Sequence, residues 1–466
     1  MLKSYIDEAG RLDSEYYSKE YIYEENQLHK LSLFSIGDKY RVTDGEHGSV
    51  EYLDDGVKYL TAENIKEGYV DLSKIRYVSN AVDERNKRAS VKAGDILISI
   101  KGTLGQIAIA EKSLAPCNMN RDVAIIKPTS APDSYNYLIA LFLMGKYGAL
   151  QSRRDGSGGV QQMITLERLR KFAIPEFSEQ FCDTLKKAYD TVLMLRAKSE
   201  EAYNEAREVL ETEIGIDMDT INEGGTVVRS FAESFGNTGR LDAEYYQPKY
   251  DEYRNHILNY KHGYTTPGNE FILVKTKCTR NLDTYPYVEI GDVDIGHGNA
   301  EYNVINNEDL PDNAKIMTHK GDLLVSTVRP YRGAVAILRE DGLLVSGAFT
   351  VLRENSHYPV ETLQVLLRTE LYKDWLLQFN VGTSYPVIKD DDILSLPIPA
   401  LKSDLHTEII KCVRTANKYL VSSKKLLEYA KQAVEMAIEQ TELTAIKWLE
   451  DKILKTKNNQ ILEIDG

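Results

Sequence analysis

Several short stretches of the chain gather side chains that can hold a polyanion and read the edges of nucleotide bases. Lysine and arginine suit phosphate groups, whereas Arg, Lys, Asn, Gln, Ser and Thr suit base edges. In the first half the candidates are Arg85, Lys87, Arg88, Lys92, Lys101, Thr103, Asn120, Arg121, Arg153, Arg154, Ser157, Gln161 and Gln162. In the second half they are Arg329, Tyr331, Arg332, Ser384 and Tyr385.

One of these stretches occurs twice. The turn "SIKGTLG" at 99–105 aligns with "STVRPYRG" at 326–333, and both present basic side chains after an apolar run. A single basic loop most commonly faces water and contacts nothing. Its recurrence at the same place in both halves leaves contact with a polyanion as the other possibility.

The residues that carry catalysis are missing from the sequence. It holds no GxxxxGK[ST] phosphate loop, no amino-methyltransferase motif and no HExxH. His47 could serve a metal or a reaction, but a lone loop histidine more commonly makes one hydrogen bond. The four cysteines lie far apart and form no CxxC pair, so neither a disulfide nor a zinc site is expected. We predict a chain that is no enzyme and holds no cofactor or metal.

Composition sets further limits. The formal charge of −14 excludes a simple basic coat for nucleic acid. Residues 231–400 hold 16 basic and 24 acidic side chains, so any DNA contact must come from local basic clusters. The chain contains no run of 18 apolar residues, so we expect no membrane span. The scattered cysteines favour a reducing cytoplasm.

The chain repeats itself at an offset of 224 to 229 residues, which reveals its domain organisation. "GRLDSEYY" at 10–17 returns as "GRLDAEYY" at 239–246, and "GDILIS" at 94–99 returns as "GDLLVS" at 321–326. The repeated segments occur in the same order in both halves. This order indicates two halves of one fold that expose two equivalent functional surfaces. The alternative is an ancient duplication that was retained only for stability. In each half, short Ile- and Val-rich runs predict strands, and short helices are expected near 134–150 and 359–378.

A long helix follows each β-rich region. Apolar or small residues recur at alternating spacings of three and four, which is typical of a coiled-coil seam. The seam positions that we expect to mediate helix pairing or partner binding are Leu185, Val192, Leu195, Ile409, Tyr419 and Leu426. An antiparallel pair within the chain is the simplest arrangement, and two surface helices on unrelated domains are the alternative.

These patterns predict an α+β protein with a pseudo-twofold internal repeat. The expected parts are a first β-rich domain at 1–176, a helix at 177–215, a linker at 216–238, a second β-rich domain at 239–400, a helix at 401–455 and a tail at 456–466.

The order of motifs resembles the specificity subunit of type I restriction–modification systems. The resemblance is carried by "VTDGEHGSV" (42–50), "GVKYLTAENIKEGYVDLSKIRYVS" (56–79), "VKAGDILISIKGTLGQIAIA" (91–110) and "GSGGVQQMITLERLRKFAIPEFSEQ" (156–180). The second half lacks a "DGEHG" run. The resemblance implies a non-catalytic subunit in which each recognition domain reads one half of a split site in double-stranded DNA. It also implies partners, namely two methyltransferase (modification) subunits docked on the helices and, further, restriction subunits.

A different class of function is compatible with the same features. A coiled-coil scaffold with two β-rich modules that bind protein or carbohydrate would also suit the acidic charge and the 30 tyrosines. A fused nuclease or methyltransferase is a third possibility, against which the missing motifs count. Replacing Arg329 and Arg332 by alanine separates the first two, because only a DNA reader would lose selectivity.

Overall fold

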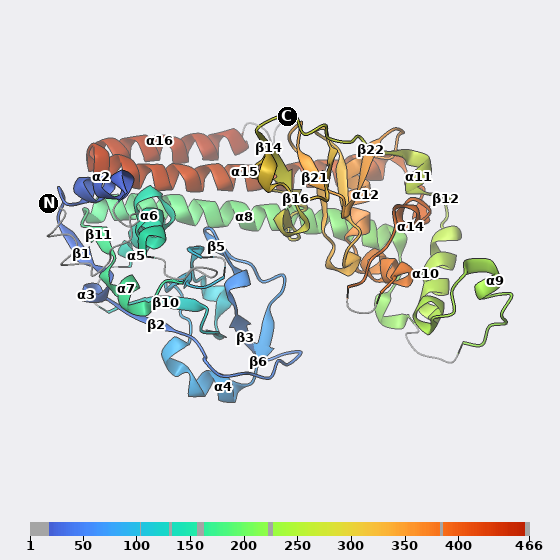
Figure 1. Cartoon of the computed structure of the whole chain (residues 1–466), viewed down its shortest axis with the longest axis horizontal. Coiled ribbons are helices and arrows are strands. Elements are labelled where there is room, and N and C mark those ends of the chain that lie inside the picture. The colour runs from blue at the N-terminus through green and yellow to red at the C-terminus, as the bar shows by residue number, and fades with distance from the viewer. Residues whose placement is uncertain are drawn as a thin grey trace. The chain divides into compact units, whose positions relative to one another are not determined.

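The computed structural model describes residues 18–102, 104–129, 133–155, 163–221, 227–382 and 385–461 (Figure 1). The chain divides into two compact units, and each is described by itself. Unit 1 comprises residues 1–196 and 420–466, and unit 2 comprises residues 197–419. No helix among the described residues is long and apolar enough to cross a membrane.

The central sheet of unit 1 has four antiparallel strands. Their order is β2 (Tyr40–Asp44), β10 (Val123–Pro128), β7 (Ile96–Ser99) and β8 (Ile107–Ile109). All residues of β7 and β8 are buried, which explains why these runs are apolar throughout and do not alternate. The other strands are β1 (Leu33–Ser35) paired with β11 (Ala173–Pro175), β4 (Ile65–Lys66) paired with β5 (Tyr69–Val70), and β6 (Arg76–Val78), β3 (Val57–Leu60) and β9 (Cys117–Met119) in that order.

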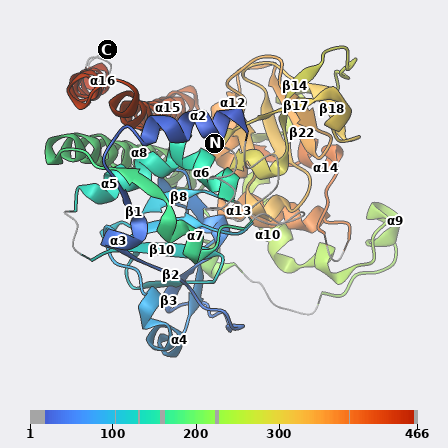
Figure 2. The ribbon, with the colours of Figure 1, turned by 60° about the vertical axis from the view of Figure 1, so that its left-hand side comes forward.

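Short helices surround these sheets in unit 1, and α5 packs on the edge strand β8 (Figure 2). The helices are α2 (Lys19–Leu28), α3 (Ile36–Lys39), α4 (Asn80–Arg85), α5 (Tyr135–Met144), α6 (Lys146–Asp155), α7 (Leu166–Lys171) and α16 (Glu442–Ile461). The 3-10 turns η2 (Ala62–Asn64), η3 (Lys87–Ala89) and η4 (Lys112–Leu114) complete the unit.

Unit 2 repeats this strand order. Its central sheet runs β13 (Phe271–Leu273), β22 (Phe349–Glu354), β19 (Leu323–Ser326), β20 (Val335–Ile337), all antiparallel. Its other strands are β12 (Tyr264–Thr265) with β23 (Ile398–Pro399), β15 (Val293–Asp294) with β16 (Asn299–Ala300), and β17 (Asn303–Asn306), β14 (Thr284–Val288), β21 (Leu344–Ser346), β18 (Ala314–Met317) in that order. Its short helices and 3-10 turns are η5 (Met218–Thr220), α9 (Phe235–Thr238), η6 (Ala243–Tyr246), α10 (Pro248–Leu258), α11 (Pro267–Glu270), η7 (Ile290–Asp292), η8 (Asn307–Asp309), η9 (Pro330–Arg332), α12 (Val360–Leu367), α13 (Glu370–Trp375), η10 (Leu376–Phe379) and α14 (Asp390–Leu394).

The two units therefore share one topology. In both, the repeated "GD" segment leads into the third strand of the central sheet, and the smaller sheet contains one parallel pair, β3 with β9 and β14 with β21. Unit 2 differs by the extra strand β18 in that smaller sheet. The strands that the repeated Ile- and Val-rich runs predict are confirmed, and so is the α+β fold class.

The repeated Gly-Asp pair has a physical reason. Gly94 and Gly321 have φ values of 87° and 91°, a left-handed conformation that favours glycine. The following Asp95 is buried and binds Lys127 Nζ at 2.8 Å, while Asp322 holds Arg353 through two contacts of 2.7 and 2.8 Å. Each pair joins the turn to the neighbouring strand, β10 or β22.

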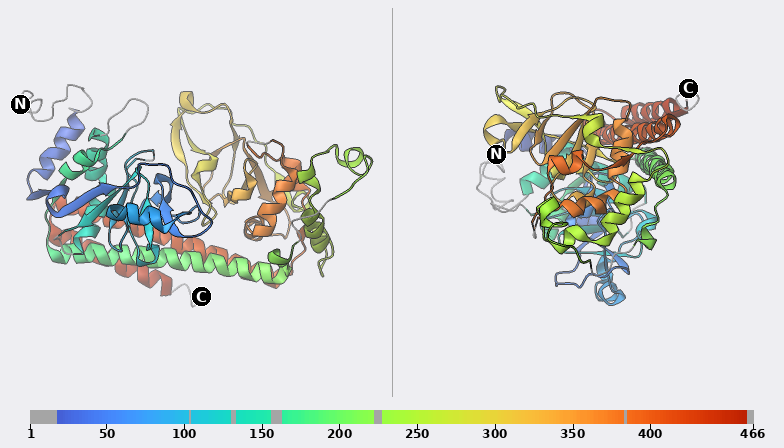
Figure 3. Two further views of the ribbon diagram at one scale, coloured as in Figure 1. Left: turned by 90° about the horizontal axis from the view of Figure 1, so that it is seen from below. Right: turned by 90° about the vertical axis from the view of Figure 1, so that its right-hand side faces the viewer.

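Two long helices, α8 (Glu179–Ile214) and α15 (Ser403–Glu439), contribute residues to both units. Within unit 2, Ser199 Oγ donates to Ala416 O at 2.7 Å, and within unit 1, Ser178 Oγ donates to Glu442 at the start of α16. The first part of α8, to residue 196, and the last part of α15, from residue 420, belong to unit 1, while the remaining parts of both helices belong to unit 2, as expected of an antiparallel pair. α15 and α16 form a hairpin and run side by side (Figures 1 and 3).

The helix boundaries differ from the predicted ones at four places. The single helix predicted at 401–455 is two helices, because Thr441 Oγ1 accepts the Thr444 N–H and begins α16. α16 continues to Ile461, where the sequence predicts a tail from residue 456. The short helices expected near 134–150 and 359–378 are each broken in two, at Gly145 and at Thr369, whose side chain caps α13.

Candidate nucleic-acid interface

The site in unit 1 is built on the loop that follows β2. Gly45 lies against backbone, since a Cβ there would stand 1.9 Å from Met119 O. The Glu46 N–H donates to Met119 O at 2.9 Å, and the Arg121 N–H donates to Glu46 O at 3.0 Å. The "DGEHG" loop is therefore fixed by backbone hydrogen bonds to the turn that follows β9.

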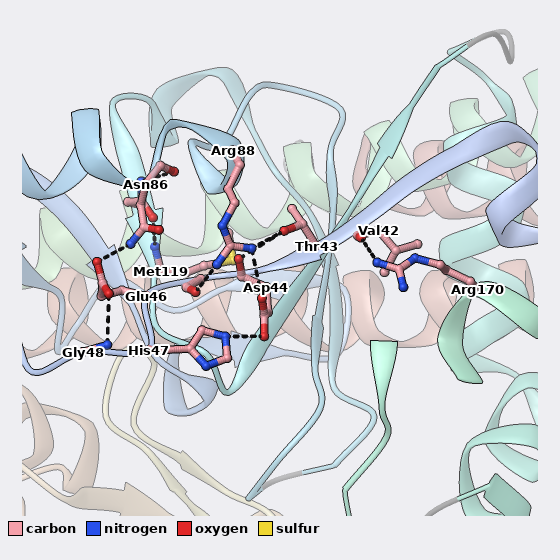
Figure 4. A network of polar contacts seen from close by, with 12 residues as sticks. Val42, Thr43, Asp44, Glu46, His47, Gly48, Asn86, Arg88, Met119 and Arg170 are labelled. Atoms are coloured by element: carbon pink, nitrogen blue, oxygen red, sulfur yellow. Dashed lines mark hydrogen bonds and ion pairs between the residues drawn. The ribbon is translucent and has the colours of Figure 1, made fainter. Parts of the chain in front are cut away.

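Acidic groups at the end of β2 and in this loop orient two of the predicted DNA-binding arginines, and Figure 4 shows the contacts of Arg88. Arg88 donates to Thr43 Oγ1 at 2.5 Å, to Asp44 Oδ1 at 3.1 Å and to Gly45 O at 3.1 Å. Arg85 Nε donates to Glu46 Oε2 at 3.0 Å. Helix α4 and turn η3 thus place both guanidinium groups over the loop.

The same carboxylates bind further groups. His47 Nε2 lies 2.8 Å from Asp44 Oδ2, and Asn86 Nδ2 donates to Glu46 Oε2 at 2.6 Å. The Gly48 N–H, together with Arg85, holds the pKa of Glu46 below its ordinary value. Among the described residues no group of three His, Cys, Asp or Glu side chains could hold a metal.

The basic side chains remain open to solvent despite these contacts. The side chains of Arg85, Lys87 and Arg88 are 59%, 73% and 40% exposed. Lys87 binds Glu84 at 2.8 Å, and this neighbour raises the pKa of the lysine. Of these three pairs, Lys87–Glu84 is exposed on both sides, so a phosphate group could replace Glu84 at small cost, whereas the Asp44 and Glu46 carboxylates are largely buried.

A second group of predicted residues lies beside this loop. The Ile100 N–H donates to Asp122 O, which places Lys101 next to the turn that carries Asn120 and Arg121. Arg121 is exposed, whereas Lys101 and Asn120 are half-buried. Lys101 also forms a backbone bridge with Met163, the first described residue after the glycine-rich loop.

Two predicted residues lie apart from this cluster. Lys92 is exposed at the start of β7, the opposite end of the strand from Lys101. Arg153 is exposed on α6, whose Gln151 binds the backbone of Ala173 in β11. The remaining candidates of the first half, Thr103, Ser157, Gln161, Gln162 and the side chain of Arg154, lie outside the described residues.

In unit 2 the aligned turn has an unusual backbone. Arg329 has a φ of 52°, which a non-glycine residue adopts only when its surroundings hold it there. Its N–H donates to Pro386 O at 2.7 Å, and its guanidinium lies 4.8 Å from the centre of the Tyr385 ring. Tyr331 and Arg332 are exposed on the same turn, and Ser384 lies outside the described residues. The turn therefore joins the two predicted segments of the second half.

The predicted seam residues are mostly buried within the chain. Leu185, Val192, Leu195, Ile409 and Leu426 are at most 1% exposed, while Tyr419 is half-buried with Lys198 5.6 Å from its ring. Buried side chains offer no surface to another protein. Any docking partner must therefore contact other residues of these helices.

The sequence reasoning missed the acidic partners of this site. Glu46, Asp44 and Asn86 set the positions of the arginines, and Asn118 Nδ2 links Asp83 to the Asn86 carbonyl. The only signal was the "DGEHG" run, whose glycine marks the close approach of two backbones.

The comparisons with known proteins agree with this geometry. Residues 44–180 match the family model described as the type I restriction modification DNA specificity domain. This part of the chain is similar to such a specificity domain. The match confirms the resemblance that the motifs indicate, and it covers the Glu46 loop, the strands β7, β8 and β10 of the central sheet, and the glycine-rich loop.

Individual relatives carry the same description. The specificity subunit of the type I restriction enzyme EcoBI from Escherichia coli is 33% identical over 91 residues, which are 20% of this chain and 18% of that relative. The match thus spans less than a fifth of the relative. The crystal structure of the type I restriction–modification S subunit from M. genitalium shares 15% identity, with 90% of this chain and 95% of that chain covered and a TM-score of 0.40. The HsdS subunit from Thermoanaerobacter tengcongensis shares 12% identity, with 91% and 96% covered and a TM-score of 0.24.

Proposed function

We propose that the chain is the DNA-specificity subunit of a type I restriction–modification complex and carries out no reaction itself. The observation that carries this proposal is the specificity-domain match over residues 44–180. Unit 2 supports a second reader, because its central sheet has the same strand order as that of unit 1. Each unit would read one half of a split site in double-stranded DNA.

The long helices would set the distance between the two half-sites. α8 has 36 residues, and at a rise of about 1.5 Å per residue a straight helix of this length spans about 54 Å. The separation of two readers on a protein fixes the spacing of the DNA segments they read. The exposed faces of the helices would dock two methyltransferase subunits, and a restriction subunit would join that assembly.

The electrostatics of the site predict that the subunit alone binds DNA weakly. Asp44 and Glu46 already neutralise Arg88 and Arg85, so few counterions are released when phosphate replaces them. We expect tight binding only after the methyltransferase subunits add their own cationic contacts. Nanomolar affinity of the purified chain at physiological salt would contradict this expectation.

The decisive experiment is sequencing of methylated bases in cells that express the neighbouring methyltransferase with and without this chain. A split, gapped motif that depends on the chain would establish specificity and give the target sequence. No dependent motif, despite association of the two proteins, would favour the scaffold that binds protein or carbohydrate.

A residue-level test uses the turn at 326–333. We expect Arg329→Ala with Arg332→Ala to lower site-specific binding or relax one half-site, by about 1–3 kcal/mol for each base that the variant no longer reads. The matched control is Lys320→Ala, because Lys320 is exposed at the other end of β19. Equal effects of the double variant and the control would contradict this role of the turn.

A further inference from the structure

The proposed function assigns no role to the repeated motif "GRLDAEYY" (239–246). In unit 2 its arginine, Arg240, makes a two-pronged contact with Asp242, with Nε and Nη2 at 2.9 and 2.6 Å from the carboxylate oxygens. The same guanidinium donates to Phe379 O at 3.2 Å and to Asn380 O at 2.7 Å. One side chain thus joins the entry of unit 2 to a segment some 140 residues further along the chain.

Aromatic residues hold this guanidinium in place. Its carbon lies 4.8 Å from the centre of the Tyr245 ring, and the edge of that ring meets Phe379. The Gln378 side chain donates to Tyr245 O at 3.1 Å. A stacked and bidentate arginine loses little rotamer freedom for each hydrogen bond it makes, so this contact is well ordered.

The carbonyl groups that Arg240 binds stand at the base of a loop. Asn380 Oδ1 accepts the Val387 N–H at 2.9 Å, and the Val381 N–H donates to Val387 O at 2.8 Å. These bonds close the segment from 381 to 387. The loop in turn holds Arg329 through Pro386 O and the Tyr385 ring.

We propose that Arg240 and Asp242 act as a clamp that positions the recognition loop of unit 2, and with it the turn that presents Arg329. This inference rests on the proposed function, which it deepens by naming residues that determine specificity without touching DNA. It also explains why the motif recurs: each half has its own glycine-containing loop before the "IP" segment. By sequence alignment Arg11 is the counterpart of Arg240, although residues 10–17 lie outside the described residues.

The alternative is a staple that only stabilises unit 2. Removing a staple would destabilise the whole unit. Removing a clamp should loosen the loop and leave the sheet intact. The matched control is Arg254→Gln, because Arg254 lines the same cleft of about 1090 Å³ and its replacement removes the same charge. Arg254 is exposed and lies on α10.

The test measures amide hydrogen exchange and methylation with the full chain. We expect Arg240→Gln to raise exchange at Val381, Val387 and Arg329 at least tenfold, with exchange in β19 and β22 unchanged. Expressed with the methyltransferase, this variant should relax the bases of one half-site and leave the other half-site intact. Arg240→Lys keeps the positive charge but loses the two-pronged contact with Asp242. We therefore expect this variant to raise amide exchange at the loop by an intermediate amount.

Each contrary result has a distinct meaning. Unchanged exchange at the loop, or equal loss of protection throughout unit 2, would overturn the clamp. Faster exchange at the loop with an unchanged methylated motif would overturn its role in specificity. If the unaltered chain directs no motif, the proposed function fails, and the specificity role fails with it; the exchange data then still decide whether Arg240 holds the loop.

Discussion

Replacing Gly45 by alanine should destabilise unit 1 severely, although glycine to alanine is the smallest change available. The added Cβ would stand 1.9 Å from Met119 O and 2.6 Å from Asn120 O. An ordinary contact needs about 3.5 Å, so the two backbones must separate by more than about 1 Å. Both obstructing atoms belong to backbone, and no flexible side chain can give way.

The cost follows from the contacts that this separation breaks. The hydrogen bonds from Glu46 N–H to Met119 O and from Arg121 N–H to Glu46 O span the same gap. Each contributes about 1 kcal/mol, and the steric strain adds about 1–2 kcal/mol. We therefore expect Gly45→Ala to lower the free energy of unfolding of unit 1 by about 3–4 kcal/mol.

The two tryptophans of the chain allow each unit to be followed separately. Trp448 belongs to unit 1 and Trp375 to unit 2. In a Trp375→Phe background, urea unfolding followed by the fluorescence of Trp448 reports unit 1. With a slope of about 2–3 kcal/mol per molar urea, the midpoint should fall by about 1–2 M.

The control for this experiment lies in the same loop. At Gly48 an added Cβ would meet only the end of the Glu46 side chain, at 3.3 Å, and no backbone atom. Gly48→Ala should therefore move the midpoint by less than about 0.3 M, a typical surface effect. If the midpoints of Gly45→Ala and Gly48→Ala coincide, the steric account of this loop is wrong.

Three further predictions concern the repeat, the helices and pH. Asp322→Asn should cost unit 2 about 2 kcal/mol, below the range for a fully buried pair because Arg353 is 37% exposed; urea unfolding followed by Trp375 checks this. Ser199→Ala should cost about 1 kcal/mol of stability, because its hydroxyl donates to Ala416 O on the other long helix. Ser423→Ala should cost less, because its hydroxyl donates to Leu420 O on its own helix. Equal urea midpoints of the two variants would contradict this difference. Burial lowers the pKa of His406 in the folded chain. As the pH falls, the histidine of the unfolded chain therefore becomes protonated at a higher pH than that of the folded chain. Unit 2 should lose stability as the pH falls through about 6.5. Unfolding curves between about pH 7.5 and 5.5 check this, and His406→Gln should flatten the slope; an unchanged slope would show that other groups cause it.

The candidate site was only partly predictable. The basic turn after the third strand was found in both halves because a repeat aligns it, and the structure places Lys101 and Arg329 there. The separation of Lys92 from Lys101 could not be found, because a strand sends residues close in sequence to opposite ends of a sheet. The carboxylates that hold Arg85 and Arg88 come from residues about 40 positions away, a distance that no local pattern spans.

The duplication, the strands and the long helices could all be derived from the amino-acid sequence. Period-3.5 spacing, β-branched runs and a positive-φ Gly-Asp turn are local preferences that the backbone obeys wherever they occur. The helix break at Thr441 depends on a local signal as well, namely a threonine that caps the start of α16. The apolar repeat along 401–455 nevertheless led to the prediction of a single helix. The role of the repeated "GRLDAEYY" became visible only in the folded chain, because Arg240 finds its acceptors on a loop that the sheet brings to it. A hydrogen bond between distant segments depends on where the core places both of them, and that placement is a property of the whole fold.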